Sequence, residues 1–421
     1  EREQGRSAVH WGLKMVPALL LSVREHLLSH LPDYLLVAAL LSSVVFLALR
    51  RRRTWRSDVS IRRSSIEKGP AREPGVWIPL DFKSPAPPPY PDWDINTTKP
   101  LPYRPFRYGP KYNITMGLRK MPFEEWIELD NQFPTYHSIR ASRILSRGAQ
   151  ASTTNTAAYD AAMELLELLV DYLPARYPSL YTRTGAGMHN THTGETFDIT
   201  VIPLGEDPMQ MAARMVQDDL AIMMEGKDGQ YYLQAGSILL AGFWRLGDKL
   251  GMPLDEIHTS GDVPGYREKL AKGMNSFFSR VMPGGPVVRN NYFMQADDCL
   301  AWSHSIGPED GGRIGWHTSG ANKGIEHYHF RSERQTLRRL PRSGGVVFTI
   351  RTYFLPITEM AKEPYVPGRL ASAIRSWGDD VAKYKGRDRW QDVLLAYLDK
   401  EHERQMAEGL EPEKEEYVYP Y

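Results

Sequence analysis

The chain has 421 residues, 42% of them hydrophobic and 24% charged, which is the composition of a globular protein with one large domain or two ordinary ones. Its 52 Lys and Arg residues are balanced by 51 Asp and Glu residues, so the net charge of +1 gives no sign of a nucleic-acid partner. The single cysteine, Cys299, excludes an intrachain disulfide and any multi-cysteine zinc or iron–sulfur site.

The N-terminal part of the chain carries a clear hydropathy signal. Residues 34–49, YLLVAALLSSVVFLAL, form an uncharged run that predicts an N-terminal transmembrane helix, although a buried helix of a soluble domain has the same pattern. Residues 1–33 form a leucine-rich amphipathic segment, which suits either a membrane surface or a signal region. An arginine-rich stretch follows at Arg50–Arg56, so the positive-inside rule predicts a single-pass membrane protein whose main domain is cytosolic.

Residues 50–105 predict a linker that is basic at first and then rich in proline. Twelve prolines lie between Pro70 and Pro110, and such a stretch is extended and builds no core of its own. The pattern is globular from residue 106 to residue 406, and an acidic tail follows at residues 407–421. We therefore expect one folded domain over residues 106–406, with the linker ending against it.

The globular part alternates between helical and strand periodicity. In chain order the predicted elements are a helix over 157–173, a helix over 208–216, a hairpin around 226–229, a helix over 270–281, strands over 287–295, 328–340 and 346–355, and helices over 368–384 and 388–406. A hairpin, a helix and then successive strands indicate an α+β fold with a largely antiparallel sheet and packed helices. No Rossmann or P-loop fingerprint follows a strand.

The strand over residues 328–340 is unusually rich in charge. Side chains alternate between the two faces of a strand, so Arg331, Glu333 and Gln335 share one face and Arg334 lies on the other. An edge strand protected by charges would show this pattern. A polar pocket wall would show it too, with Glu333 binding a cation and an arginine binding an anion, and Arg351 of the next strand is a candidate member of that wall.

His258 lies in the stretch EIHTSGDVPGY, between an apolar segment and a Pro-Gly turn. A histidine at such a place can be a solvated loop residue, a hydrogen-bonded core residue or a metal ligand, and spacing alone leaves the three open.

Three long blocks resemble one known family. GFWRLGDKLGMPLDEIHTSGDVPGYREKLAKGMNSFF at Gly242–Phe278, RSERQTLRRLPRSGGVVFTIRTY at Arg331–Tyr353 and MGLRKMPFEEWIELD at Met116–Asp130 are together similar to the haem-dependent oxidative N-demethylase family. The resemblance runs from about residue 106 to residue 355, and the membrane segment points to the fungal-type, membrane-anchored members. The resemblance does not cover the membrane segment, the linker or the acidic tail.

The resemblance implies a PAS-like sheet that encloses haem b, with a histidine as axial ligand of the iron. It implies the oxidative N-demethylation of a small alkylamine, with O2 as co-substrate, formaldehyde as product and electrons from a separate NAD(P)H-dependent reductase. The chain itself carries no nicotinamide, flavin or multi-cysteine signature, which agrees with an external electron donor.

The resemblance also assigns roles to single residues. His258 matches the histidine of the family's IHxPVPGY block, although the stretch IHTSGDVPGY carries extra residues between the histidine and the valine, which puts the local loop geometry in doubt. We expect Arg245 and Arg289 to hold the haem propionates, because guanidinium groups suit carboxylates. Glu333 is the candidate catalytic residue and would pair with the alkylammonium, and Arg334 and Arg351 are the other candidate substrate-binding residues.

Two further functions agree with the same residues. A membrane-anchored haem-based sensor or ligand-binding protein would use the same pocket without turnover, although no output domain follows the sheet. A structural membrane-associated protein that has lost haem is the other. The partners we expect are the amine, the reductase and a lipid bilayer, with no nucleic acid.

Overall fold

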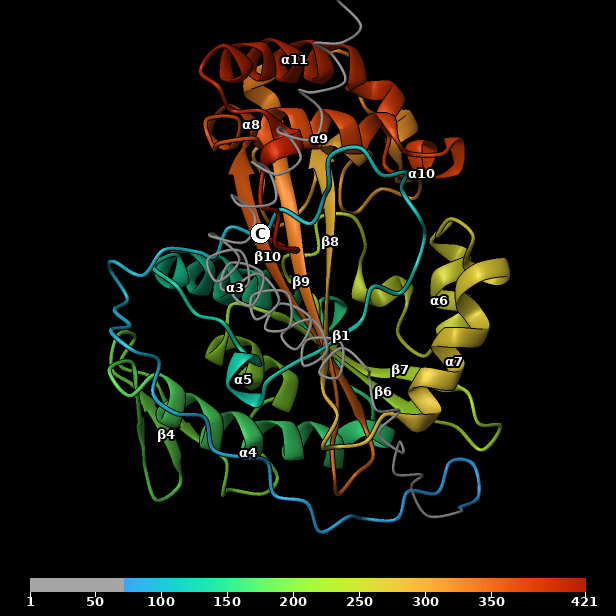
Figure 1. Ribbon diagram of the computed structural model, residues 1–421. Coiled ribbons are helices and arrows are strands. Elements are labelled where there is room, and N and C mark those ends of the chain that lie inside the picture. Colours follow the sequence, from blue (N-terminus) through green and yellow to red (C-terminus); the bar gives the residue numbers. More distant parts are fainter. Residues whose placement is uncertain (1–71) are drawn as a thin grey trace, which may run out of the picture. The chain divides into compact units, whose positions relative to one another are not determined.

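The computed structural model describes residues 72–421, and a large antiparallel sheet lies at its centre (Figure 1). The strand order in this seven-stranded sheet is β1-β8-β9-β10-β6-β7-β2, and a second, three-stranded sheet has the order β3-β4-β5. The strands are β1 Arg119–Lys120, β2 Ser152–Thr154, β3 Tyr181–Arg183, β4 Gly187–Asn190, β5 Thr196–Asp198, β6 Asp219–Glu225, β7 Tyr231–Ser237, β8 Val287–Gln295, β9 His329–Arg339 and β10 Val346–Pro356.

Helices pack on both faces and at one end of the large sheet. They are α3 Phe133–Arg147, α4 Tyr159–Arg176, α5 Pro208–Met215, α6 Leu254–Ser260, α7 Ala271–Arg280, α8 Ile357–Met360, α9 Val366–Arg375, α10 Asp379–Tyr384 and α11 Gln391–Ala407. Figure 1 shows α3, α4 and α5 on one side of the sheet, α6 and α7 on the other side, and α8, α9 and α11 at the end of the long strands.

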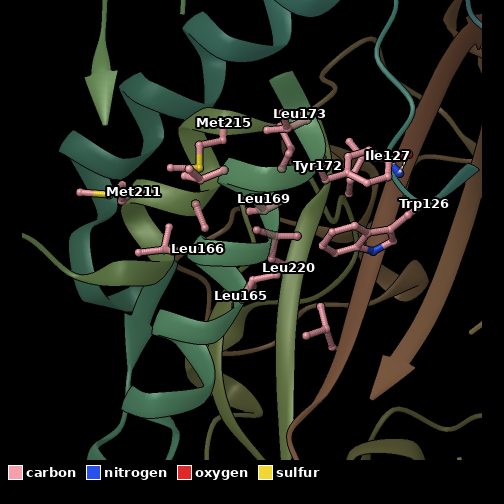
Figure 2. Packing of buried hydrophobic residues seen from close by; sticks show 14 of the residues in the cluster. Trp126, Ile127, Leu165, Leu166, Leu169, Tyr172, Leu173, Met211, Met215 and Leu220 are labelled. Atoms are coloured by element: carbon pink, nitrogen blue, oxygen red, sulfur yellow. Dashed lines mark hydrogen bonds between the residues drawn. The ribbon is translucent and has the colours of Figure 1, made fainter. Parts of the chain in front are cut away.

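The first face of the sheet packs against α4 and α5. Leu165 and Leu169 of α4, one helical turn apart, contact the same cluster as Leu220 of β6 and Val347 of β10. Trp126 closes this cluster from a segment that precedes α3, and its ring is fully buried (Figure 2). Burying such residues contributes about 1.5–3 kcal/mol each, so this face anchors the fold.

The second face packs against α6 and α7. Ala221 of β6 and Phe348 of β10 each follow a residue of the first face directly, so their side chains lie on the opposite face of the sheet. They form a cluster with Leu254 of α6 and Phe278 of α7. A third cluster joins α9 and α11 to the ends of β8 and β9. The second face is the one on which the candidate site lies.

The predicted α+β fold with a largely antiparallel sheet and packed helices is confirmed. The predicted hairpin is formed by β6 and β7, and the observed bounds of β8, β9 and β10 lie within one residue of the predicted ones. The helix over 208–216 is also present, because the Asp207 side chain accepts a hydrogen bond from Met209 N and caps α5. Several elements had no clear signal in the sequence: α3, α6, α8, and strands β1 to β5.

Two helix predictions were wrong in detail. α4 continues past Pro174 to Arg176, because a proline in the last turn removes only one helical hydrogen bond. The single helix predicted over 368–384 is two helices, α9 and α10, since the chain is extended at Gly378 between them.

β9 is not an edge strand. It pairs with β8 on one side and with β10 on the other, and all of its residues are buried. Its charged side chains therefore do not protect an exposed edge, and each of them needs a partner inside the protein.

The predicted transmembrane helix over residues 34–49 and the amphipathic segment before it lie outside the described residues. Within residues 72–421, no helix has both the length and the apolar run needed to cross a bilayer. The described part of the linker and the acidic tail both lie against the domain: Trp93 Nε1 donates to Leu129 O at 2.7 Å, and Arg369 Nη1 of α9 donates to Glu415 Oε1 at 2.6 Å.

Candidate functional site

His258 lies on the short helix α6 rather than in a loop, with its ring half-buried. Its Nδ1 lies 2.8 Å from the backbone oxygen of Leu254. A carbonyl oxygen only accepts, so Nδ1 carries the proton and Nε2 keeps a free lone pair. Burial lowers the pKa of His258, the Leu254 hydrogen bond opposes this, and the charge of Arg289 adds to the lowering. The imidazole is therefore held neutral, with one nitrogen available to bind a metal ion.

The Pro-Gly turn acts on His258 through Tyr266. The two rings stack with centroids 4.7 Å apart and planes at 8°, and the Tyr266 hydroxyl donates to Asp255 at 2.5 Å. Gly265 has a φ of 60°, which favours glycine, and the chain then forms a π-helix over Tyr266–Leu270 before α7. Such π-turns often occur at functional sites. The ring of His258 is thus fixed on one side by the turn and on the other by its own helix.

Arg289 projects from β8 and acts on His258 through its charge. Within residues 72–421 its guanidinium makes no hydrogen bond, and its Nε is buried without a partner. Burial lowers the pKa of Arg289, while Tyr112 and Glu333 raise it. A half-buried guanidinium without a protein acceptor is suited to an anionic ligand that presents a carboxylate.

Glu333 lies on the same face of the sheet, on β9. One of its carboxylate oxygens accepts from Gln335 Nε2 at 2.8 Å, and the other accepts no hydrogen bond within the described part of the chain. Burial raises the pKa of Glu333, against the opposing effect of nearby positive charges. The carboxylate therefore has one oxygen free for a cationic ligand.

Two residues at the end of α10 join this group, although no sequence motif marks them. The charge of Glu333 acts on both Lys385 and Tyr384, and the charge of Arg289 acts on both as well. Tyr384 stays protonated at neutral pH, because burial and the Glu333 charge raise its pKa to about 12. A lysine next to a glycine at a helix end resembles any surface turn, so only the folded chain reveals this position.

Arg334 and Arg351 lie on the opposite face, directly across from each other on β9 and β10. Arg334 Nε lies 2.9 Å from Glu128 Oε1, and Arg351 Nη2 lies 2.6 Å from Asp130 Oδ2. Both arginines and Asp130 are buried, and the Glu128 side chain is 14% exposed. The expectation that Arg351 shares a wall with Glu333 is thus corrected, because the strand register turns it the other way.

Arg245 is also not free to bind a propionate. Its Nε donates to Asp248 at 2.7 Å, and its Nη1 donates to the backbone oxygens of Glu309 and Gly311 at 2.8 and 3.1 Å. The side chain therefore holds a loop in place.

The residues of the second face fit a haem group. A neutral imidazole with a free Nε2 suits an axial ligand of the iron, and its Nδ1–H is oriented by a carbonyl oxygen, as metal-binding histidines require. The unpaired guanidinium of Arg289 suits a propionate, and Phe348 and Phe277 give this face its apolar surroundings. No group of three or more His, Cys, Asp or Glu side chains within residues 72–421 is arranged to hold a bare metal ion.

A comparison with protein families agrees with this geometry. A family model described as haem-dependent oxidative N-demethylase, alpha subunit-like, matches residues 117–395, which is more than half of the chain. The matched span includes His258, Arg289, Glu333 and Lys385. This chain therefore belongs to the haem-dependent oxidative N-demethylase, alpha subunit-like family.

Proposed function

We propose that this chain binds haem b through His258 and removes a methyl group from a small alkylamine as formaldehyde. The observation that carries the proposal is the half-buried His258, whose hydrogen bond to Leu254 leaves Nε2 free. The overall reaction balances as amine plus O2, two electrons and two protons, giving the demethylated amine, formaldehyde and water. Haem would supply the activation of O2 that protein side chains cannot provide.

The chain's own residues would bind and orient the reactants. Arg289 would hold a haem propionate, and the free oxygen of Glu333 would attract the alkylammonium. The apolar cluster around Phe348 and Phe277 would keep bulk water away, which strengthens the attraction between Glu333 and the amine. Electrons would come from a separate NAD(P)H-dependent reductase, which makes that reductase a required partner.

The fold supports this proposal at the level of topology. We infer that the core is PAS-like: five consecutive strands of the sheet have the order β7-β6-β10-β9-β8, and α6 and α7 are inserted between β7 and β8. The inserted helices cover the second face, and α6 carries His258. A ligand between the sheet and these helices would contact residues from both.

The test is the visible spectrum of the full-length chain purified in detergent. We expect a Soret band, and we expect His258→Ala to lose or strongly alter it while His327→Ala keeps it, because the His327 side chain is 56% exposed. A folded His258→Ala protein with wild-type haem content and spectrum would exclude His258 as the ligand.

Turnover is tested separately, with an electron donor, O2 and a panel of methylamines. Formaldehyde release supports the demethylase. Spectral changes on adding amine, with no formaldehyde under any donor, would instead favour the membrane-anchored sensor.

We also propose that residues 34–49 anchor the protein in a membrane. We infer from the arginine-rich stretch after residue 49 that the domain faces the cytosol. In intact microsomes the domain should then be open to added protease. Asn96 and Asn113 each stand in an N-glycosylation sequon, so glycosylation at either would contradict this orientation.

A further inference from the structure

Lys385 is a buried ammonium group at the open edge of β8. β1 pairs only with Val287 and Val288, so no strand within residues 72–421 lies next to the rest of that edge. Lys385 follows α10 and returns to this edge, where its Nζ donates to the backbone oxygen of Tyr292 and lies 3.5 Å from Asn291 Oδ1. Only 2% of the residue is exposed. A lysine in such a position must be stabilised by its surroundings or lose its proton.

Aromatic rings supply part of that stabilisation. The Nζ lies 4.2 Å from the ring centroid of Phe293, 4.7 Å from that of Tyr292 and 5.5 Å from that of Trp377. No carboxylate within residues 72–421 forms a direct ion pair with Lys385. The pKa of Lys385 is lowered to about 7, first by burial and further by Arg289, with Glu333 opposing.

Glu333 lies directly across the strand pair from Asn291, whose Oδ1 is 3.5 Å from Lys385 Nζ, and the charges of three cations act on it. Arg331, Lys385 and Arg289 all favour its ionised form. Arg331 is committed to the fold, because its guanidinium donates to the backbone oxygens of Leu240 and Leu300. Of the three, Lys385 alone can lose its proton near neutral pH.

The remaining titratable groups around Lys385 and Glu333 do not change charge in this range. Tyr384 precedes Lys385, and its pKa is raised to about 12 by burial and by Glu333. Tyr112 approaches from the segment before β1, and burial raises its pKa as well. Both hydroxyls therefore stay neutral between pH 5 and pH 9, by a margin of roughly a pH unit or more.

A substrate ammonium would bring a fourth positive charge beside one carboxylate. We propose that Lys385 is the counter-ion of Glu333 in the amine-free site, and that it releases its proton to solvent when an alkylammonium binds beside Glu333. Only the N–H bond of Lys385 breaks, the proton goes to buffer, and the ligand keeps its own charge. This inference rests on the proposed amine site, and it makes Lys385 a residue that sets how amine affinity depends on pH.

The experiment uses the haem-loaded full-length chain and tetramethylammonium chloride, a cation that has no proton to lose. Calorimetric titration in two buffers of different ionisation enthalpy, phosphate and Bis-Tris near pH ~6 and borate and CHES near pH ~9, gives the number of protons released on binding. We expect about one proton per site near pH 6 and almost none near pH 9, with an affinity that falls about tenfold per pH unit below the pKa of Lys385.

Two variants locate the source of the proton. Lys385→Arg keeps the positive charge permanently, so it should release no proton and should bind the probe at least tenfold more weakly than wild type near pH 8. Lys385→Met removes the competing charge, so its affinity near pH 6 should equal or exceed that of wild type. Both should keep the wild-type Soret band, because Lys385 does not hold the haem.

Each outcome below tests the role of Lys385, and the last two also test the proposed demethylase activity. No proton release by the wild-type chain near pH 6 would overturn the role of Lys385, and this measurement needs no variant. Release that persists in Lys385→Arg would place the proton on Glu333 and would also overturn it. Formaldehyde production without proton release would leave the demethylase standing and remove only this inference. Failure to bind any alkylammonium would remove both.

Discussion

Substituting Arg334 tests whether its charge stabilises the fold or binds the substrate. Arg334 and Glu128 are almost fully buried, with side chains 2% and 14% exposed, and their N–O distance is 2.9 Å. Arg334 also donates to the backbone oxygens of Trp126 and Glu125. We expect Arg334→Met to destabilise the domain, because it leaves the Glu128 carboxylate buried without its cation.

The magnitude follows from what Glu128 retains. Breaking one partner of a buried ion pair costs about 3–5 kcal/mol. The hydroxyls of Tyr103 and Tyr353 still donate to the Glu128 carboxylate at 2.6 and 2.5 Å, so the loss should lie near the lower value, at about 3 kcal/mol. For the 350 described residues, an unfolding entropy of about 2.1 cal/mol/K per residue converts that loss into a fall in Tm of roughly 4 °C.

Thermal unfolding followed by circular dichroism and by the Soret band measures this loss. The control is Arg375→Met, since Arg375 and Asp399 are 50% and 40% exposed and such a pair contributes about 0–1 kcal/mol. Amine binding well below the Tm should be unchanged in both variants. A variant of Arg334 with wild-type Tm and lost amine binding would refute the structural role and restore Arg334 as a substrate residue.

Three further predictions concern the fold. Burial raises the pKa of Asp218 from 3.8 to about 7, so the folded chain binds a proton that the unfolded chain loses, and the free energy of unfolding falls as the pH rises between these two values. Asp218→Asn should therefore gain stability relative to wild type between pH ~5 and pH ~8. Melting temperatures of the two proteins that depend on pH in the same way would contradict this. Gly242→Ala should lower the Tm more than Gly251→Ala, because both have positive φ but only at Gly242 would the new Cβ lie 2.7 Å from the Arg331 guanidinium; equal losses would show that backbone conformation alone matters. Asp207→Ala should cost about 1–2 kcal/mol in chemical denaturation while Asp207→Asn keeps most of the cap, and no difference between them would exclude the capping role.

The long strands of the large sheet were predictable because their sequence signals are local. β8, β9 and β10 combine alternating or β-branched residues with turn residues at both ends, so their bounds could be predicted closely. α3 was missed because its polar residues mask the buried positions Phe133, Tyr136 and Ile144. The break between α9 and α10 was missed because one glycine in a helical pattern is often tolerated.

The candidate site was only partly predictable, because its partners come from distant segments. His258 and Arg289 lie in stretches whose chemistry can be proposed from residue type and resemblance. Arg245 binds the Glu309–Gly311 loop, and Lys385 binds β8. Both contacts join residues that are roughly 60 to 100 positions apart, so no local sequence pattern predicts them. The strand register that separates Arg351 from Glu333 is equally non-local.

The two faces of β9 show why the buried charges of one strand can have different purposes. On the face toward α4, Glu128 and Asp130 are each paired with an arginine, and the exception, Asp218, avoids its unpaired charge through a raised pKa. On the face toward α6 and α7, Arg289 has no acceptor and Glu333 has a free oxygen. Unpartnered buried donors occur on both faces, Arg338 Nε and Arg351 Nε among them, so they do not by themselves mark a ligand site. The second face differs because, within residues 72–421, it combines a guanidinium without a hydrogen bond, a carboxylate with one free oxygen and a histidine with a free Nε2, and these are groups that a haem and an ammonium would complete.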